Sequence, residues 1–459
     1  MTDEIGAITM RFSDEGEAIT YVFKSIARLR DVERGPDEIS RDVTPTKQLV
    51  QAADLLREPR EYAVVTGSKG KGSTTVITSK LLEHLGHTVG TITSPHLVSY
   101  RERIRVNGKA IPSADLIRIL DDLAPEIDRI EATLTGTQYF SPQGIFLAIA
   151  LRWFDEQGVT AAVLEVGRGG RFDDISVVPN RLSLFTPILL EHVKQLGRTV
   201  ERIAWHKAGI IKPYSYAYSV PQAQEVLDVL QAEADHQNAE FAWIAPMDMG
   251  EYVGETPDGM RMRLGRYGEL TLSLKGHYQI MNATLAVQGA GNMHGRLSGV
   301  PHGSPEYVEA IRAGLADVKW LGRVHKLADS PAIWLDGATT VIAARSVLES
   351  VPLNPPLVTV LGIPVDRDYE GVYRLFGEKS TALVLTESNI NFNIHFPDPA
   401  VALAAARQVN ADVSYAPELA GAIEIARRKA GSDGTIILAV AQPLVGEAML
   451  LWGLTLEEI

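Results

Sequence analysis

The feature that most constrains this chain is an apolar run that leads into a glycine-rich turn at residues 63–75, Ala-Val-Val-Thr-Gly-Ser-Lys-Gly-Lys-Gly-Ser-Thr-Thr. The pattern predicts a buried strand, a tight loop and then a helix over 76–85, which is the arrangement that surrounds a nucleotide phosphate with backbone amides. Lys71 can reach the terminal phosphates, and the Ser73 hydroxyl is placed to bind Mg²⁺. Three residues without a side chain let the main chain approach the phosphate closely: Gly67, Gly70 and Gly72. The segment therefore predicts ATP binding.

The spacing of this loop, G-x-x-G-K-G-S, is shorter than the common G-x-x-x-x-G-K-[ST] pattern. A glycine turn in a doubly wound sheet that binds no phosphate is the structural alternative. We favour the phosphate site because a lysine and a serine both stand where the chemistry needs them.

The composition describes a globular protein of two or three domains. The 459 residues exceed one ordinary core, and 45% apolar and 22% charged residues are typical of globular chains. The absence of cysteine excludes disulfides, thiol nucleophiles and thiolate metal sites. A net charge of −13 argues against a nucleic-acid partner. Because no secretory signal and no unbroken apolar span is apparent, we expect a cytoplasmic protein without a membrane partner.

Strand and helix signals alternate along most of the chain. The first sixty residues are mainly helical in pattern, and short β-like runs between 241 and 275 read as antiparallel additions. Between these regions we expect strands at 63–66, 89–93 and 161–166 and helices that start at Ser113 and cover 144–154. This alternation predicts a doubly wound, mostly parallel sheet with helices on both faces.

A second α/β alternation follows a stretch rich in glycine, proline and serine at 297–305. Its strands are expected at 333–336, 357–361, 382–385 and 436–440, with helices between them. We therefore expect a first domain at 1–322, a smaller second domain at 323–459, and a hinge close to 321–325.

A run of arginines occurs at 101–109, Arg-Glu-Arg-Ile-Arg-Val-Asn-Gly-Lys. If this segment is a strand, side-chain alternation puts Arg101, Arg103 and Arg105 on one face. An anion-binding face and a solvated edge strand both fit the pattern.

Two further polar groups follow expected strands. Glu165 ends the strand at 161–165, and ligands of open parallel sheets gather beyond the carboxyl ends of strands, so Glu165 and Ser73 should share one crevice. That pair suits Mg²⁺, which prefers oxygen ligands, while a buried structural glutamate is the alternative. His192 follows an apolar strand expected at 182–190 and could bind a metal or a phosphate, although a lone histidine at a strand end more often does neither.

Several groups of residues together resemble the folylpolyglutamate synthase/dihydrofolate synthase branch of the Mur ligases. They occur in the family's order and cover most of the chain: Thr66 to Ser73, Thr93-Ser-Pro-His-Leu97 with Arg101-Glu-Arg-Ile104, Glu165-Val-Gly-Arg-Gly-Gly-Arg-Phe-Asp173, His192 with Leu196-Gly197, Ile203-Ala-Trp-His-Lys-Ala-Gly-Ile-Ile-Lys212, Gly276-His-Tyr-Gln-Ile-Met-Asn-Ala283, Trp320-Leu-Gly-Arg323 and Asp336-Gly-Ala338. The resemblance implies a P-loop-containing central domain of the Mur ligase type and a second, smaller Rossmann-like α/β domain.

The resemblance also implies a role for particular residues. The catalytic residues would be Lys71, which contacts the γ-phosphate, His192 and Lys207, which matches a lysine that is often carbamylated. The metal site would comprise Ser73, Ser94, Glu165 and His192. On sequence alone, Lys207 would instead read as a helix-end lysine that reaches solvent. The nucleotide would lie between the domains and be bound by Gly67, Ser68, Lys69, Gly70, Lys71, Gly72, Ser73, Thr74, Asn282 at the adenine, Arg323 near the phosphates and Asp336 at the ribose.

The implied reaction is ATP-dependent amide formation by a protein that is commonly a monomer. A substrate carboxylate attacks the γ-phosphoryl group to give an acyl phosphate, with Mg²⁺ and Lys71 stabilising the developing charge. The amino group of an incoming amino acid, by resemblance L-glutamate, then displaces phosphate. A folate-type carboxylate is the expected acceptor.

The chain departs from the family pattern at several positions. Ser68-Lys69 replaces Thr-Asn, the segment 140–144 lacks a Phe-Glu pair, and Thr339-Thr340 stands where the family has His-Asn. In addition, Glu191 and His206 replace an aspartate and a glutamate, and Val440-Ala-Gln replaces a Gly-Ser pair. Two other hypotheses follow: a ligase of the same chemistry that acts on a non-folate carboxylate, and a non-catalytic nucleotide-binding module.

Overall fold

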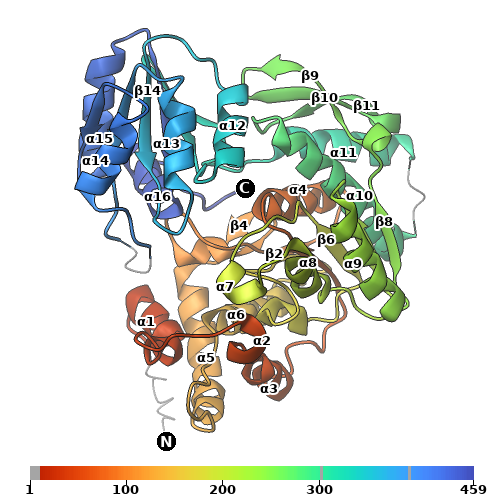
Figure 1. Ribbon diagram of the computed structural model, residues 1–459. Coiled ribbons are helices and arrows are strands. Elements are labelled where there is room, and N and C mark those ends of the chain that lie inside the picture. The colour runs from red at the N-terminus through yellow and green to blue at the C-terminus, as the bar shows by residue number, and fades with distance from the viewer. Residues whose placement is uncertain (1–10, 300–302, 391–393) are drawn as a thin grey trace, which may run out of the picture. The chain divides into compact units, whose positions relative to one another are not determined.

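The computed structural model describes residues 11–299, 303–390 and 394–459 (Figure 1). The chain divides by contacts into two compact units. Unit 1 comprises Met1–His96, Tyr100–Met249 and Asn282–Leu315, and unit 2 comprises Leu97–Ser99, Gly250–Met281 and Ala316–Ile459. The domain boundary expected at 322/323 stays a prediction.

Unit 1 is built on an eight-stranded sheet in the order β4-β3-β2-β5-β1-β6-β7-β8. All neighbouring pairs from β2 to β8 are parallel, whereas β3 is antiparallel to β2 and to β4. The central strands are buried on both faces, as their mostly apolar sequences favour. The strands are β1 (Glu61–Thr66), β2 (Val89–Ile92), β3 (Ile104–Val106), β4 (Lys109–Ala110), β5 (Ala161–Glu165), β6 (Leu182–Phe185), β7 (Tyr216–Ser219) and β8 (Glu240–Trp243).

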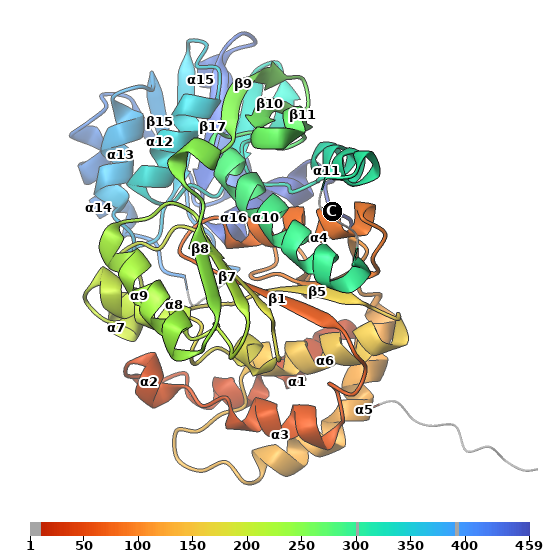
Figure 2. The same cartoon turned by 90° about the vertical axis from the view of Figure 1, so that its right-hand side faces the viewer.

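Helices cover both faces of this sheet (Figure 2). On one face, α4 (Lys71–His84) and α10 (Tyr278–Ser298) pack on the strands, and α11 (Pro305–Asp317) lies against α4, where Gly314 approaches Leu81. The other face carries α6 (Pro142–Glu156), which approaches β2 so closely that Phe154 leaves no room for a side chain at Gly90. Further helices contribute residues to the apolar core of this second layer: α1 (Glu15–Ala27), α3 (Thr44–Ala52), α5 (Ser113–Glu131), α7 (Val193–Leu196), α8 (Val200–Ala208) and α9 (Gln224–His236). The short helix α2 (Asp37–Ser40) contributes none.

The local sequences explain these helices. In α5 the buried residues recur at helical spacing, from Leu116 through Ile119, Leu120 and Leu123 to Ile130, which gives one apolar face. Ser141 caps α6 because its hydroxyl accepts from the Gln143 amide, and a proline follows at the first turn.

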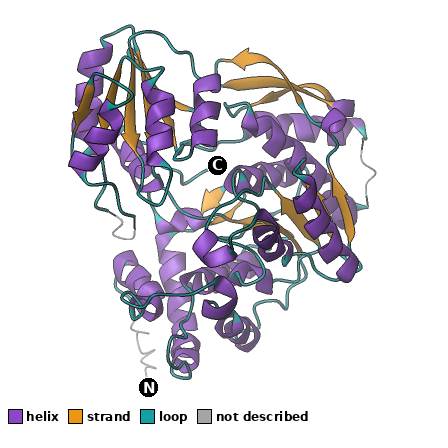
Figure 3. Cartoon of the chain, in the orientation of Figure 1, coloured by secondary structure: helices purple, strands orange, loops and turns teal. Residues whose placement is uncertain are grey.

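Unit 2 contains a six-stranded sheet in the order β12-β13-β17-β14-β15-β16, in which only β12 is antiparallel. Its strands are β12 (His325–Asp329), β13 (Ala332–Asp336), β14 (Leu357–Gly362), β15 (Ala382–Leu385), β16 (Val413–Tyr415) and β17 (Thr435–Val440). The helices of this part are α12 (Val341–Ser350), α13 (Tyr369–Gly377), α14 (Pro399–Arg407), α15 (Leu419–Ala430) and α16 (Gln442–Leu451). Unit 2 also contains an antiparallel sheet of β9 (Glu251–Thr256), β10 (Gly259–Leu264) and β11 (Gly268–Leu272). Figure 3 shows the helices of the chain in purple and its strands in orange.

The predicted fold class is confirmed. Strands expected at 63–66, 161–166 and 382–385 form β1, β5 and β15, with ends that differ by two residues or fewer. Within the described ranges, no helix is long and apolar enough to cross a membrane.

The arginine segment is different from its prediction. Tyr100–Arg103 forms a 3₁₀ turn, so Arg101 and Arg103 do not alternate along a strand with Arg105. Arg105 is fully buried in β3 and donates to the Thr93 hydroxyl. The expected strand at 182–190 also ends early, at Phe185, so that His192 lies in the following loop.

Candidate functional site

The carboxyl ends of three adjacent strands bring two predicted metal ligands together. In the sheet register, Val65 of β1 pairs with Glu165 of β5, and Ile92 of β2 pairs with Leu164. The chain beyond β2 then turns so that the Ser94 amide donates to Oε2 of Glu165 at 2.8 Å. Glu165 is buried at the same sheet edge from which the glycine-rich loop departs.

The glycine-rich loop is a close-fitting backbone cradle. Gly67 has φ +145°, and a Cβ there would lie 1.9 Å from the Thr186 hydroxyl oxygen. Gly70 is the left-handed N-cap of α4 with φ +86°, and a Cβ there would lie 2.3 Å from Oδ1 of Asn282. Both positions therefore exclude a side chain on conformational and on steric grounds. The loop leads directly into the N-terminus of α4, where unpaired amides favour an anion.

Two loop residues attach the cradle to its surroundings. The Ser68 amide donates to the Pro187 carbonyl at 2.7 Å, and the Ser68 hydroxyl accepts from the Leu189 amide at 2.9 Å. Thr74 donates from its hydroxyl to Oδ1 of Asn282 at 3.5 Å. The structure thus places Asn282 beside the loop, and the segment after β6 is tied to Ser68.

Two lysines converge on one carbonyl oxygen of the loop. The Nζ atoms of Lys71 and Lys207 donate to the Gly67 carbonyl at 3.1 Å and 2.7 Å. Lys207 is buried, at 1% exposure, and its Nζ lies 3.4 Å from Oε1 of Glu191. Burial and the nearby Lys71 charge lower the pKa of Lys207 to about 7, against the opposing effect of Glu191.

Glu191 is held ionised by this arrangement. Burial alone would raise its pKa, but Lys207, Lys71 and His192 together with a hydrogen bond from Ser68 lower it below the usual value. The cradle is therefore bordered by two amines and one carboxylate, a set that can compensate added phosphate charge.

His192 adopts a left-handed conformation, φ 48° and ψ 40°, and is the N-cap residue of the one-turn helix α7. It directly follows Glu191, the acid that faces Lys207. Among the described residues, no group of three or more histidine, cysteine, aspartate or glutamate side chains could hold a metal ion. A cation bound here would need hydroxyls, water and phosphate oxygens in addition to Glu165, which is the coordination that Mg²⁺ prefers.

The two remaining predicted ligands belong to unit 2. Asp336, at the end of β13, is buried, and its Oδ2 accepts from the Tyr278 hydroxyl at 3.2 Å and from the Val324 amide at 2.8 Å. Val324 has φ 45°, so this hydrogen bond fixes a left-handed residue. The preceding Arg323 donates to the Gly322 carbonyl at 2.7 Å, and Gly337 lies against its guanidinium.

The sequence does not identify two of the partner residues. It presents Glu191 only as a replacement for aspartate, although Glu191 is the acid that faces Lys207. Tyr278 belongs to a matched motif and has no predicted role, although it contacts Asp336. In both cases the available signal is a polar residue within a recognised motif, and the tertiary contact identifies its partner.

Comparison with known proteins agrees with this geometry. Residues 65–290 match the family model described as the Mur ligase middle domain. The chain is 30% identical over 320 residues to the dihydrofolate synthase/folylpolyglutamate synthase of Bacillus subtilis, which covers 68% of this chain and 72% of that protein. It is also 30% identical over 401 residues to the corresponding Mycobacterium tuberculosis protein, with 81% and 80% covered.

A solved structure supports the same relationship. The Mycobacterium tuberculosis folylpolyglutamate synthase, complexed with ADP and AMPPCP, superposes with a TM-score of 0.79 at 26% identity, covering 95% of this chain and 99% of that one. The fold and the phosphate-loop site thus define an ATP-dependent carboxylate–amine ligase of the Mur ligase type. Within that class, the chain belongs to the folylpolyglutamate synthase/dihydrofolate synthase family, as the sequence motifs predicted.

Proposed function

We propose that this chain uses ATP to join the amino group of L-glutamate to the carboxylate of a folate-type acceptor, with release of ADP and phosphate. The observation that carries the proposal is the cradle at Gly67 and Gly70, bordered by Lys71 and Lys207. Backbone amides and a lysine at the start of a helix are suited to a nucleotide triphosphate. The family relationship supports the ligase chemistry.

The proposed first step is attack of the acceptor carboxylate on the γ-phosphoryl group. Lys71, whose amine donates to the Gly67 carbonyl at 3.1 Å, turns to the phosphate and neutralises charge on the transferring oxygens. The loop over 67–74 binds the remaining phosphates through backbone amides such as that of Gly72, whereas the amides of Ser68 and Thr74 donate to the Pro187 and Gly70 carbonyls. The acyl phosphate then reacts with the amine of the incoming amino acid, and phosphate leaves.

We propose that Mg²⁺ is bound by Ser73, Ser94, Glu165 and His192 with water and phosphate oxygens. The hydrogen bond from the Ser94 amide orients the Glu165 carboxylate, and Ser73 occupies the first turn of α4. Oxygen-rich ligation of this kind fits the donor set that these residues offer. When bound, the ion would neutralise phosphate charge and orient the γ-phosphoryl group.

We propose that Lys207 is carbamylated. Only a neutral amine reacts with CO₂, and the pKa of about 7 caused by burial makes the neutral amine abundant near neutrality. The test is incubation of the protein with isotope-labelled bicarbonate, followed by detection of a labelled carbamate. Lys207→Met should remove the label, and an unlabelled wild-type protein would contradict the assignment.

In unit 2, Asp336 would bind the ribose and Arg323 the phosphates, while Asn282 of unit 1 would contact the adenine. The role of Asp336 is supported by the fixed position of its carboxylate, because the Tyr278 hydroxyl and the Val324 amide both donate to the Oδ2 atom. We also propose that the protein acts as a cytoplasmic monomer on small molecules, without nucleic acid or membrane partners.

A second candidate keeps this chemistry and changes the acceptor to a non-folate carboxylate. It is motivated by two departures from the family pattern, at residues 140–144 and at Thr339-Thr340. One hydroxyl in each segment caps a helix, because Ser141 accepts from the Gln143 amide and Thr340 accepts from the Ala343 amide. These two residues therefore have structural roles, which leaves the acceptor to be decided by assay.

The deciding experiment is ADP release by the purified protein in the presence of ATP, Mg²⁺ and L-glutamate. Release should require both a pteroate or folate acceptor and glutamate. Lys71→Ala should reduce turnover by about 10²–10³-fold, because it removes one charge-stabilising donor, whereas the exposed Lys109→Ala should not. Turnover with another carboxylate but not with folates would select the second candidate. ADP release that needs no acceptor would contradict both.

A further inference from the structure

Residues 167–173, which follow β5 in unit 1, form a loop that we call the bridging loop. The Thr66 hydroxyl donates to the carbonyl of Gly169 in this loop at 2.7 Å. Thr66 is fully buried at the end of β1, and the next residue is Gly67, whose carbonyl accepts from both lysines of the site. The bridging loop is therefore attached to the chain at the point where the phosphate loop begins.

The bridging loop also packs against the carboxyl end of α8. The Arg171 amide donates to the His206 carbonyl at 2.7 Å. A Cβ at Gly170 would lie 2.8 Å from the carbonyl oxygen of Lys207, so the loop backbone and the helix are in close contact. Because Lys207 in turn donates to the Gly67 carbonyl, the position of the bridging loop affects both sides of that hydrogen bond.

Arg41, which directly follows α2, binds the bridging loop and the residue after it. Its Nη1 atom donates to the Arg168 carbonyl and to Oδ2 of Asp173, each at 3.3 Å. Its Nη2 atom donates to Oδ2 of Asp174 at 3.4 Å. The planar guanidinium can hold several oxygens at once because its donors have fixed directions. Since 13% of the Arg41 side chain is exposed and both aspartates are buried, solvent screens these contacts only weakly.

The two aspartates depend on this cation. Asp173 closes the loop on itself, because its Oδ2 accepts from the Arg168 amide at 3.3 Å and its Oδ1 accepts from the Ile175 amide at 3.2 Å. Burial raises the pKa of Asp174, Arg41 opposes this rise, and the charge of Asp173 adds to it. Without Arg41, the adjacent buried carboxylates would lose this compensating charge. The loop would then have to open to water, or one acid would have to take up a proton.

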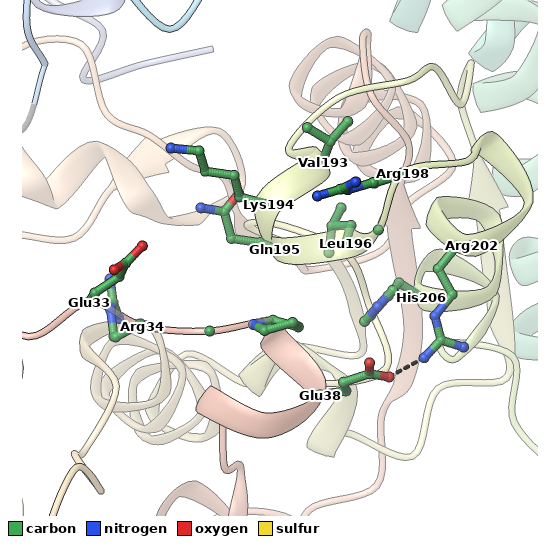
Figure 4. Close-up of a pocket in the computed structure, with 13 residues that line it drawn as sticks. Glu33, Arg34, Glu38, Val193, Lys194, Gln195, Leu196, Arg198, Arg202 and His206 are labelled. Atoms are coloured by element: carbon green, nitrogen blue, oxygen red, sulfur yellow. Dashed lines mark hydrogen bonds and ion pairs between the residues drawn. The ribbon is translucent and has the colours of Figure 1, made fainter.

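The segment that carries Arg41 is itself anchored. The Nε atom of Arg168 donates to Oδ2 of Asp37 at 3.0 Å, so α2 and the bridging loop hold each other. A second link joins α2 to α8 through the ion pair of Glu38 with Arg202 (Figure 4). These two side chains are 33% and 41% exposed, and exposed ion pairs contribute little to stability. The buried contacts of Arg41 are therefore the stronger connection between α2 and the site.

We propose that Arg41 is a positioning residue for the ligase reaction. It holds the bridging loop in the conformation in which Gly67 and Lys207 are arranged for phosphate binding, and it acts through the loop rather than on the substrates. Loss of Arg41 should therefore weaken nucleotide binding by displacing groups that Arg41 does not itself contact. This inference rests on the proposed function, because the site that Arg41 positions is the proposed ATP site.

Three variants separate positioning from a general loss of stability. Arg41→Met removes the guanidinium, and Arg41→Lys keeps its charge without its planar shape. The matched control is Arg60→Met, because Arg60 is also a buried arginine paired with an aspartate, Asp155, but it precedes β1 at the strand end opposite Gly67. Both methionine variants break a buried ion pair and should lose stability, which thermal unfolding measures and which checks that each variant is folded.

Hydrogen exchange of the ligand-free protein, read by mass spectrometry, tests the structural step without any nucleotide. In Arg41→Met, exchange should become at least about tenfold faster in peptides that cover 167–173 and 203–210, because local openings of the bridging loop become more frequent. Arg60→Met should leave these peptides within about twofold of wild type. Unchanged exchange in Arg41→Met, or equal acceleration in both variants, would overturn the proposal.

Calorimetric titration with the ATP analogue AMPPCP and Mg²⁺ tests the consequence for the site. Arg41→Met should bind at least about tenfold more weakly than wild type, because small displacements of positioned groups are costly. Arg41→Lys should recover most of this loss and remain about threefold weaker, since it restores the charge but not the fork of donors. Arg60→Met should bind as wild type does.

The two measurements distinguish failure of this inference from failure of the proposed function. Wild-type affinity for AMPPCP in Arg41→Met, or the same loss in Arg60→Met, would overturn the positioning role. A wild-type protein that does not bind AMPPCP, with the expected exchange pattern in Arg41→Met, would instead refute the proposed use of ATP and retain Arg41 as the residue that holds the bridging loop.

Discussion

Nζ of Lys207 lies 3.4 Å from Oε1 of Glu191, where the Lys207 side chain is buried and 12% of the Glu191 side chain is exposed. Because burial disfavours the ammonium form, the pKa of Lys207 falls to about 7 even with this acid beside it. Glu191, by contrast, is held ionised with a lowered pKa. The Lys207 amine therefore changes its charge near neutral pH, and it does so next to the phosphate loop.

This arrangement predicts how stability depends on pH. The pKa of Lys207 is about 7 in the folded protein and about 10.4 in an unfolded chain, so the unfolded state binds more protons between these values. The free energy of unfolding should therefore gain a rising contribution as pH increases from 7 toward 10. Below pH 7 Lys207 is protonated in both states, so the free energy of unfolding is lowered by the full cost of its buried charge.

Urea unfolding in bicarbonate-free buffer at several pH values measures this contribution. Lys207→Met should be more stable than wild type near pH 7, and the difference should shrink as pH rises. Glu191→Gln should act in the opposite direction near neutrality, because it removes the charge that favours the ammonium. A pH-independent difference between Lys207→Met and wild type would contradict the lowered pKa.

Gly70 provides a test of the cradle that separates backbone strain from steric exclusion. Gly70→Ala places a Cβ at φ +86° and 2.3 Å from Oδ1 of Asn282. Gly86→Ala places one at φ +89° with no atom within 4 Å. Each should lose about 1–2 kcal/mol of stability from the left-handed conformation, but only Gly70→Ala should also weaken ATP binding.

Denaturant unfolding and nucleotide titration of the two variants compare these effects directly. Gly86 lies just beyond the end of α4, whereas Gly70 lies at its start, so both report on the same helix. Equal losses of ATP affinity in the two variants would show that the closeness of Asn282 is irrelevant to the cradle.

The sequence predicted the elements whose signal is local. The buried runs that became β1 and β5 and the glycines at 67 and 70 are identified by residue type alone, and the parallel register then places Glu165 beside the loop. Tertiary relationships were not accessible in the same way. The Glu191–Lys207 pair joins a loop after β6 to α8, and no spacing rule connects them.

The arginine segment shows why pattern alone fails. Arginines at 101, 103 and 105 have the spacing of one strand face, but Tyr100–Arg103 forms a 3₁₀ turn and only Arg105 lies in β3. Arg105 is fully buried although its residue type favours exposure. The spacing of charged residues therefore does not determine the backbone conformation of this segment.

Thr340 gives a prediction about a departure from the family pattern. Its hydroxyl accepts from the Ala343 amide and caps α12, so Thr340→Ala should cost about 0.5–2 kcal/mol. Thr340→Asn restores the residue typical of the family and keeps a capping oxygen, so its stability should equal that of wild type. Thermal unfolding measures both changes, with Thr339→Ala as the neighbouring control.

The same variants address acceptor choice. If Thr339→His/Thr340→Asn leaves the rate with folate acceptors unchanged, the native threonines act only on α12. A large gain in folate turnover would instead show that these positions restrict the acceptor, which favours the non-folate candidate.

We expect Asp336 to stabilise unit 2, in addition to its proposed role in nucleotide binding. Its Oδ2 satisfies two donors, the Tyr278 hydroxyl and the amide of Val324, which has φ 45°. Asp336→Ala leaves both without an acceptor, and unpaired buried donors cost about 1–3 kcal/mol each. Tyr278→Phe removes only one hydrogen bond and should cost about 1 kcal/mol.

The interaction energy follows from a double-mutant cycle on the urea midpoints of Asp336→Ala, Tyr278→Phe and the double variant. Because the residues are in direct contact, the double variant should lose less stability than the sum of the single changes. Asp329→Ala, an exposed acid on β12 with 89% of its side chain accessible, is the control and should be near neutral. Strict additivity of the two single changes would show that the Tyr278–Asp336 hydrogen bond contributes nothing to stability.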